Sequence, residues 1–372
     1  MALELATYLD SLSQTLKKEG YSTEESFLKL PFDEDNLREV MEATKNLNVT
    51  DVFVIGIGGS SLGTKAIYEA LFSYTNPSTK LHFLDQINVE KIQYLVKDLE
   101  KKDPKKTAFI TISKSGKTLE TRKNYELLKE HLPWKAGFHE ILITGKDSEF
   151  PINREKATTL TIPQEVGGRF SVFSPVGLVP LALTKIDVVQ LLKGAMQATK
   201  EISENPEKTI KNVTEVFENY KNGKKIYNIF VFSPKLKTLA FWYQQLLGES
   251  LGKENKGFFP AVSEGSKDLH SLQQYFAGGT QNTQHEFLIS KDENKYQQTI
   301  MKAVQETYKE KQIPFRTHIL EETNEEELGK FMQTKMMEVL LLAKLLEVNP
   351  FGQPDVEAYK SKTRELLANE NL

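Results

Sequence analysis

The sequence predicts an α/β protein of two lobes, each a three-layer α/β/α unit with a mostly parallel sheet. Its 372 residues exceed what one hydrophobic core usually serves, so about two domains of ~150 residues are expected. Short apolar runs rich in β-branched residues alternate with longer segments of helical periodicity, the pattern of a sheet with crossover helices. Several runs are continuously apolar, as expected for strands buried on both faces.

The first lobe is expected over residues 40–185, after an N-terminal helical segment at residues 1–39. Five short apolar runs, each followed by a turn or a helical pattern, predict its strands. These runs cover residues 51–57, 80–84, 107–112, 140–144 and 158–162. Their alternation with helices indicates a parallel sheet.

A second lobe with the same pattern is expected over residues 186–347, as a helical linker followed by a sheet. A helical stretch at residues 186–204 and a polar break at 205–208 come first. Strands are predicted at residues 225–232, 257–262, 286–290 and 315–320, and a long helix at about 324–347. Residues 348–372 form a C-terminal segment whose helix begins at Pro354. The lobes share a pattern but no residue-level repeat.

Composition and charge exclude several classes of protein. With 39% hydrophobic and 27% charged residues, the chain is neither disordered nor fibrous. A net charge of -3 gives no broad attraction to nucleic acid or to an acidic membrane surface. The absence of cysteine removes disulfides and thiolate chemistry and fits a reducing compartment. No apolar window is long enough for a membrane span, and residues 1–18 do not have the pattern of a secretory signal, so we expect a cytoplasmic protein.

A glycine-rich turn, GIGGSSLG at residues 56–63, follows the first predicted strand and precedes a helix. At such turns the free backbone N–H groups and the helix dipole favour an anion or a sugar hydroxyl. Ser61 stands where a dinucleotide fingerprint needs its third glycine, and no Gly-Lys-Thr ends the turn as a P-loop would. The alternative is a tight strand-to-helix turn without a ligand.

A second polar turn, SKSGKTLET at residues 113–121, ends the strand predicted at 107–112. It carries four hydroxyl groups just before a helix, those of Ser113, Ser115, Thr118 and Thr121. Hydroxyls and helix N-terminal amides together make a phosphate cradle. The turn is not a P-loop, because Thr111 stands where that motif needs a glycine. The alternative is a helix N-cap with a solvated turn.

A carboxylate and a guanidinium stand in two further motifs. Apolar residues at helical spacing predict a helix over residues 236–250, with Glu249 near its C-terminus and Gln245 on the same face. A carboxylate at the negative end of a helix dipole is a stronger base, suited to abstracting a carbon-bound proton. Arg169 follows two flexible glycines, and its fixed charge suits a developing oxyanion. The alternatives are a solvated glutamate and a surface arginine.

His270 differs from the other histidines of the chain because it lies in a polar turn that enters a helix, where it could act as an acid near neutral pH. The remaining histidines show no metal-like i, i+4 pairing, and no His-Glu-x-x-His occurs. Lys360 lies on the final predicted helix, where spacing alone favours a solvent-facing side chain.

Six motifs together resemble the phosphoglucose isomerase family of the sugar-isomerase (SIS) fold. They are GIGGSSLG at 56–63, SKSGKTLET at 113–121, GGRFSVFSPVGL at 167–178, ESLGK at 249–253, DLHSLQQ at 268–274 and QPDVEAYK at 353–360. Each motif alone is a weak signal of the family, but six motifs in the same order across nearly the whole chain are a specific one. The resemblance implies two SIS-type lobes, a C-terminal segment that completes the site, a homodimer, and no metal or organic cofactor.

The resemblance also implies roles for single residues. Glu249 matches the base that moves a proton between C2 and C1, and Arg169 matches the group that stabilises the cis-enediolate. His270 and Lys360 match the residues that open the sugar ring. The matched phosphate binders are Ser113, Ser115 and Thr118, with the backbone of Lys114. The other matched positions are the sugar-contacting Gly59 and Ser60, the histidine-orienting Glu120, and the substrate-side amides of Gln245 and Gln353.

These matches predict an aldose-ketose isomerase that interconverts D-glucose 6-phosphate and D-fructose 6-phosphate in glycolysis and gluconeogenesis. One alternative is a non-catalytic sugar-phosphate sensor on the same fold, which would not need Glu249, Arg169, His270 and Lys360 together. Another is a related isomerase that acts on mannose 6-phosphate or an amino sugar.

The resemblance further implies that the histidine reaches the partner subunit's site. We therefore expect a homodimer in which His270 is contributed in trans. The polar segment at residues 253–267 precedes His270 and could project away from its own lobe, which would carry the histidine away from Glu249.

Overall fold

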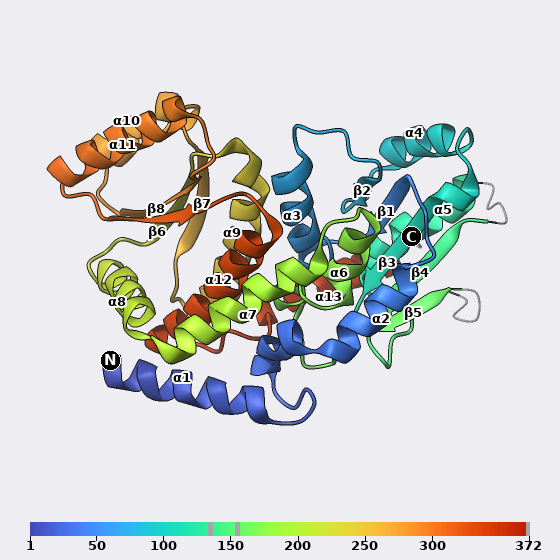
Figure 1. Ribbon diagram of the computed structural model, residues 1–372, viewed down its shortest axis with the longest axis horizontal. Helices are drawn as coiled ribbons and strands as arrows, with labels where there is room; N and C mark the ends of the chain where they lie inside the picture. Colours follow the sequence, from blue (N-terminus) through green and yellow to red (C-terminus); the bar gives the residue numbers. More distant parts are fainter. Residues whose placement is uncertain (133–136, 153–156, 370–372) are drawn as a thin grey trace.

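The computed structural model describes residues 1–132, 137–152 and 157–369. It contains two parallel sheets with the strand orders β2-β1-β3-β4-β5 and β7-β6-β8-β9. The first sheet comprises β1 (Asp51–Ile55), β2 (Lys80–Leu84), β3 (Thr107–Ser113), β4 (His139–Thr144) and β5 (Thr158–Thr161). The second comprises β6 (Ile226–Val231), β7 (Phe259–Glu264), β8 (Thr283–Ser290) and β9 (Phe315–Leu320). In Figure 1 the two sheets lie on opposite sides of the molecule, with α7 and α12 between them.

All the predicted strands are present, and the prediction of an α/β fold with two parallel sheets is confirmed. The largest difference is at β8, which begins at Thr283 rather than at residue 286. The added residues are polar but buried, because each finds a partner inside the lobe. The Gln284 amide donates to the Val216 carbonyl across 3.3 Å, and His285 Nδ1 lies 3.1 Å from the Asn228 amide.

Helices cover both sheets, as the alternating pattern predicted. Those before and within the first lobe are α1 (Ala2–Lys17), α2 (Glu34–Thr44), α3 (Leu62–Phe72), α4 (Val89–Leu99), α5 (Leu119–His131) and α6 (Pro175–Leu183). Those that follow are α7 (Val188–Glu204), α8 (Glu207–Lys221), α9 (Lys237–Leu251), α10 (Gln273–Gly278), α11 (Lys295–Glu310), α12 (Glu325–Leu346) and α13 (Pro354–Asn369). Short 3-10 turns at Glu24–Phe32, Gly58–Ser60, Gly168–Phe170 and Asp268–His270 also matter below.

The largest apolar cluster runs through both lobes, with one satellite cluster in each. Its centre is the crossing of α7 and α12, which two glycines bring into close contact. A Cβ on Gly194 would lie 1.8 Å from the Glu326 carbonyl oxygen, and one on Gly329 would lie 1.9 Å from that of Leu191. Because the lobes share this core, the elements that carry the site are held in one fixed arrangement.

A buried ion-pair network lies between the second sheet and α12, beneath α9. Arg316 pairs with Glu286 at 2.9 Å and with Glu338 at 2.7 Å, and Lys335 pairs with the same two carboxylates. Burial alone would raise the pKa of Glu286, but Arg316 and Lys335 hold it well below its usual range. Removing one partner of such a network leaves an unpaired buried charge, which costs about 3–5 kcal/mol.

The N-terminal segment is part of the same body. In Figure 1, α1 lies along the underside of the second lobe, where it packs on α7, α8 and α12. In the described ranges, no helix combines the length and the apolar character that crossing a membrane requires.

Candidate active site

A cavity of about 740 Å³ lies where turns that follow β1, β3 and β4 meet α9 and the start of α13. Such a position, beyond the carboxyl ends of parallel strands, is where ligands of α/β proteins bind. All the predicted site residues except Ser113 and His270 line it. They are Gly59, Ser60, Lys114, Ser115, Thr118, Glu120, Arg169, Gln245, Glu249, Gln353 and Lys360.

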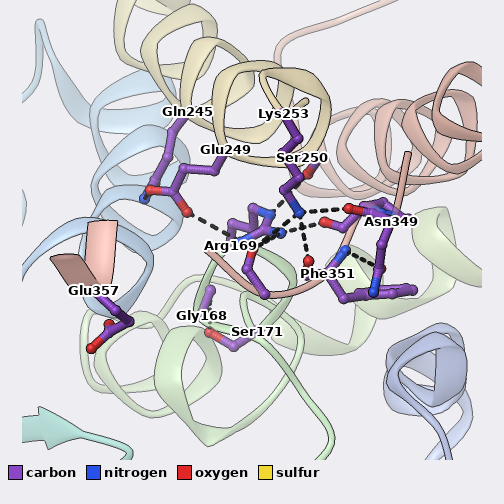
Figure 2. A network of polar contacts seen from close by, with 12 residues as sticks. Gly168, Arg169, Ser171, Gln245, Glu249, Ser250, Lys253, Asn349, Phe351 and Glu357 are labelled. Atoms are coloured by element: carbon purple, nitrogen blue, oxygen red, sulfur yellow. Dashed lines mark hydrogen bonds and ion pairs between the residues drawn. The ribbon is translucent and has the colours of Figure 1, made fainter. Parts of the chain in front are cut away.

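Glu249 and Arg169 face each other in this cavity (Figure 2). Glu249 lies in the last turn of α9, as predicted, and Gln245 lies one turn earlier on the same face. The Gln245 amide donates to Oε1 of Glu249 across 2.8 Å, and Nη1 of Arg169 donates to Oε2 across 3.3 Å. The carboxylate is therefore held at both oxygens, and a carboxylate so fixed can act as a positioned base.

Arg169 is almost wholly buried, with 4% of its surface exposed. Its Nε donates to the Ser250 hydroxyl across 2.8 Å, and its Nη2 donates to the carbonyls of Pro350 and Gly352. Burial lowers the pKa of Arg169, while Glu249 acts in the opposite direction. The guanidinium is thus a fixed, desolvated positive charge, which is what stabilisation of a developing oxyanion requires.

A cluster of three aromatic rings lies next to Arg169. The rings of Phe27 and Phe170 stack with their centroids 4.4 Å apart, and Phe351 lies 5.5 Å from Phe170. The three rings come from the 3-10 turn at Glu24–Phe32, the arginine turn and the C-terminal segment. The Phe170 ring centroid lies 5.2 Å from Cζ of Arg169, so three segments far apart in sequence meet next to the guanidinium.

The polar turn after β3 forms one wall of the cavity. Ser115, Thr118 and the half-buried Lys114 side chain reach this wall. Ser113 does not, because it is buried at the end of β3 and donates to the Thr118 hydroxyl across 3.2 Å. Burial lowers the pKa of Lys114, whose ammonium donates to the Val166 carbonyl across 3.1 Å. The wall thus offers hydroxyl groups and positive charge to an anion.

The glycine turn after β1 packs directly on the arginine turn. A Cβ on Gly59 would lie 2.2 Å from the carbonyl carbon of Gly168 and 2.6 Å from the backbone nitrogen of Arg169. No side chain fits there, so only glycine allows the two turns to meet. Gly59 and Ser60 therefore lie beside Arg169 in the same cavity wall.

The last helix, α13, supplies Lys360 to the cavity, and Gln353 lines it just before the helix begins. None of the described residues of α13 is buried. The Lys360 ammonium donates to the Glu357 carboxylate across 2.9 Å, one turn earlier on the same helix. Although spacing alone favoured a solvent-facing Lys360, the structure places this side chain at the cavity wall.

His270 lies outside the cavity of its own chain. It is exposed at the end of the turn Asp268–His270, and its side chain has no hydrogen-bonded partner among the residues that the structure describes. The expectation that residues 253–267 project away from the lobe is wrong, because residues 259–264 pair with β6 as the edge strand β7. His270 follows that strand on the second lobe and does not line the cavity that contains Glu249 of the same chain, which agrees with the expected separation of these two residues.

Several charged residues in or near the cavity have no role in the predicted site, and three of them are Glu24, Glu357 and Lys253. Glu24 belongs to the N-terminal segment and lines the cavity; burial, then Glu25 and Glu165, raises its pKa. Glu357 pairs with Lys360, and Lys253 binds the turn that leads into α13. The ESLGK and QPDVEAYK motifs contained Lys253 and Glu357, but nothing in the sequence marked Glu24. In the described ranges, no cluster of three or more His, Cys, Asp or Glu could hold a metal ion.

Comparison with known proteins places most of the chain in one family. Residues 39–293 match the family described as Phosphoglucose isomerase. A glucose-6-phosphate isomerase from Methanocaldococcus jannaschii is 33% identical over 351 residues, which cover 87% of this chain and 86% of the relative. One from Bacillus anthracis is 32% identical over 388 residues, which cover 91% and 85%.

Solved structures show the same likeness. A hypothetical protein from Thermus thermophilus superposes with a TM-score of 0.84 at 31% identity, covering 97% of this chain and 95% of the other. A glucose-6-phosphate isomerase from Chlamydia trachomatis superposes with a TM-score of 0.80 at 18% identity, covering 99% of this chain and 85% of the other. The second likeness supports the SIS-type fold alone.

Proposed function

The chain belongs to the phosphoglucose isomerase family, and from this premise we propose how its cavity interconverts glucose 6-phosphate and fructose 6-phosphate. The protein is an aldose-ketose isomerase of this specificity. The observation that supports our assignment of residue roles is the contact of Glu249 with Arg169 inside the cavity. A base next to a fixed positive charge is the pair that an enediol mechanism requires.

In this proposal Glu249 removes the proton from C2 of the open-chain aldose and returns it to C1. The electron pair of the C–H bond forms the C1–C2 double bond of the enediol, and the carbonyl oxygen O1 takes up negative charge. The hydroxyl proton of O2 passes to O1, so that C2 becomes the carbonyl when the first proton is returned to C1. Arg169 stabilises that charge, because its guanidinium is already desolvated and fixed before the reaction. Gln245 keeps the carboxylate oriented through its bond to Oε1.

The phosphate of the substrate binds the wall formed by Ser115, Thr118 and Lys114, with Ser113 supporting Thr118 from below. With the phosphate bound at this wall, Gly59 and Ser60 contact the sugar, and Gln353 of the C-terminal segment contacts it as well. Lys360 opens the ring together with His270, which Glu120 orients. Residues 348–372 thereby complete the site between the two lobes, at residues 40–185 and 186–347, with residues 1–39 packed against them.

We further propose a homodimer in which His270 acts in the partner's site. Two observations support it: His270 is exposed, and it does not line the cavity of its own chain. Two apolar side chains on the same, mostly polar segment are also exposed, with Leu272 and Tyr275 each at 39%. A second copy of the chain that covered these side chains would bring His270 toward another cavity.

A cytoplasmic location is part of the proposal. The absence of cysteine is typical of, though not specific to, a protein of a reducing compartment.

The activity is tested with purified protein and fructose 6-phosphate, with glucose 6-phosphate formation followed through a coupled dehydrogenase. We expect turnover that a chelator does not change. The same assay with mannose 6-phosphate separates this specificity from that of a broader sugar-phosphate isomerase. No turnover of fructose 6-phosphate by folded protein would contradict the proposal.

A further inference from the structure

Two cations, the buried Arg169 and the half-buried Lys253, hold the turn that leads into α13. Arg169 donates to the carbonyls of Pro350 and Gly352. Lys253 donates to the carbonyls of Asn349, Phe351 and Gly352, the first at 2.6 Å and the last at 3.1 Å. All four carbonyl oxygens of residues 349–352 therefore point at these two side chains, as Figure 2 shows for Asn349 and Phe351.

We propose that Lys253 is a positioning residue for the isomerase reaction, because its grip on residues 349–352 fixes α13 and Lys360 over the cavity. The claim rests on the proposed role of Lys360 in ring opening. It assigns no contact between Lys253 and the substrate, since Lys253 does not line the cavity.

The position of α13 depends on this turn because the helix has little else to hold it. None of its described residues is buried. The bond from Lys360 to Glu357 lies within the helix and cannot fix the helix in place. The turn is tied to the body by the Phe351 ring and by the two cations. Loss of one cation therefore frees the segment that carries Gln353 and Lys360.

The hydrogen bonds from Lys253 to this turn also connect Arg169 to α13. Lys253 and Arg169 share the Gly352 carbonyl, so the two cations are held side by side by one oxygen. Lys253 follows Glu249 by one helical turn, at the start of the loop that leaves α9. A shift of Lys253 would thus move the carbonyls that orient the guanidinium, as well as the helix that carries Lys360.

The electrostatic surroundings make this grip dependent on pH. Burial, and then the positive charge of Arg169, lowers the pKa of Lys253 to about 8. Carboxylates of three elements oppose the shift: Glu24 of the N-terminal turn, Glu249 of α9 and Glu254 of the following loop. As pH rises through about 8, the ammonium loses its charge and its hold on the carbonyls weakens. An arginine at this position would keep its charge there.

The test uses full-length protein with Lys253→Met, Lys253→Arg and Lys256→Met. Lys256 is the matched control, because it lies on the same loop and donates to the Glu347 carbonyl at 3.4 Å, outside the turn. Ring opening is measured as the rate of exchange between the anomers of fructose 6-phosphate by NMR, next to kcat and KM for isomerisation.

For Lys253→Met we expect ring opening and kcat to fall about 10²-fold, since a displacement of ~1 Å in a catalytic group costs that much. Lys256→Met should match the wild type. Lys253→Arg should restore most of the rate and move the alkaline limb of the kcat profile upward from about pH 8. A purely structural role would change thermal stability but not the pH profile of the folded enzyme.

Two results would overturn the claim: normal ring opening in Lys253→Met, or an alkaline limb that stays in place in an active Lys253→Arg enzyme. The second remains decisive if Lys253→Met does not fold. Lys360→Ala separates this claim from the one it rests on. Normal ring opening in Lys360→Ala would refute the proposed function of that lysine and with it the role of Lys253. If ring opening is slow in Lys360→Ala but normal in Lys253→Met, the proposed function of Lys360 stands and only the role of Lys253 is refuted.

Discussion

Nη1 of Arg169 donates to Oε2 of Glu249 across 3.3 Å, and this contact joins a turn of the first lobe to a helix of the second. Glu249 is held within its own lobe by Gln245, whereas the hydrogen bonds that fix the Arg169 guanidinium go to Ser250 of the second lobe and to the carbonyls of Pro350 and Gly352. Arg169 follows the glycines of the first-lobe turn, and Glu249 lies in the last turn of α9. The chemistry thus depends on how the lobes are held together as well as on the two side chains.

Substitution of Gly59 should separate the two turns that meet beside Arg169. Gly59→Ala would place a Cβ 2.2 Å from the carbonyl carbon of Gly168, where neither backbone has room to move without displacing the guanidinium. We expect a fall of about 10²-fold in kcat/KM. Gly248→Ala is the control, because its Cβ would meet only Pro260 at 3.5 Å. Equal activity of the two variants would show that the close approach is unimportant.

The wall after β3 should contribute to binding more than to chemistry. Ser115→Ala and Thr118→Ala each remove a hydroxyl from a phosphate that stays bound in ground and transition states alike. A hydrogen bond to a charged group contributes about 1.5–3 kcal/mol, so KM should rise about tenfold or more with kcat little changed. Thr75→Ala, an exposed hydroxyl outside the cavity, is the control. A collapsed kcat with an unchanged KM would move this wall from binding to catalysis.

His285 should make the fold sensitive to acid. It is 2% exposed, and burial, with a smaller contribution from Lys224, lowers its pKa to about 3. An unfolded histidine has a pKa of about 6.5, so the unfolded state binds the proton first as pH falls. Stability from this group is therefore complete above pH ~6.5 and is lost toward pH ~3, at up to about 1.4 kcal/mol per pH unit.

The measurement is the midpoint of thermal unfolding between about pH 4.5 and 7. His285→Gln should weaken its dependence on pH, whereas His139→Gln on the first lobe should not. If the unfolding midpoint of both variants depends on pH as strongly as that of the wild type, His285 does not remain neutral in the folded state.

Local pattern predicted the strands, the carboxylate at the end of α9 and the polar turn after β3, because each depends on residues close together in sequence. The sequence could not show that Ser113 lies beneath Thr118 rather than in the wall, since that depends on how β3 ends. For a related reason Glu24 was missed, and Lys253 was given no role although the ESLGK motif contains it. Their positions follow from contacts between segments far apart along the chain, and a charged residue in a polar segment gives no local signal of such a contact.

The shared site is tested by mixing subunits. If His270 acts in the partner's cavity, heterodimers of Glu249→Gln and His270→Ala chains carry one site with both lesions and one with none. Mixing under conditions of subunit exchange should restore about a quarter of the wild-type activity. Light scattering and a tagged subunit confirm that dimers form and exchange. An inactive mixture of folded, exchanging subunits would require His270 to act in its own chain or not at all.

The central claim is that Glu249 carries the proton between C2 and C1. It is tested most directly by incubating fructose 6-phosphate in D₂O with wild-type, Glu249→Gln and Glu254→Gln protein and following deuterium at both carbons by NMR. The amide of Glu249→Gln keeps the volume of the side chain but cannot accept a proton. We predict exchange and isomerisation reduced about 10²–10⁴-fold or more with sugar-phosphate binding retained, and normal rates for Glu254→Gln. Glu249→Gln protein that isomerises and exchanges near the wild-type rate would contradict the account.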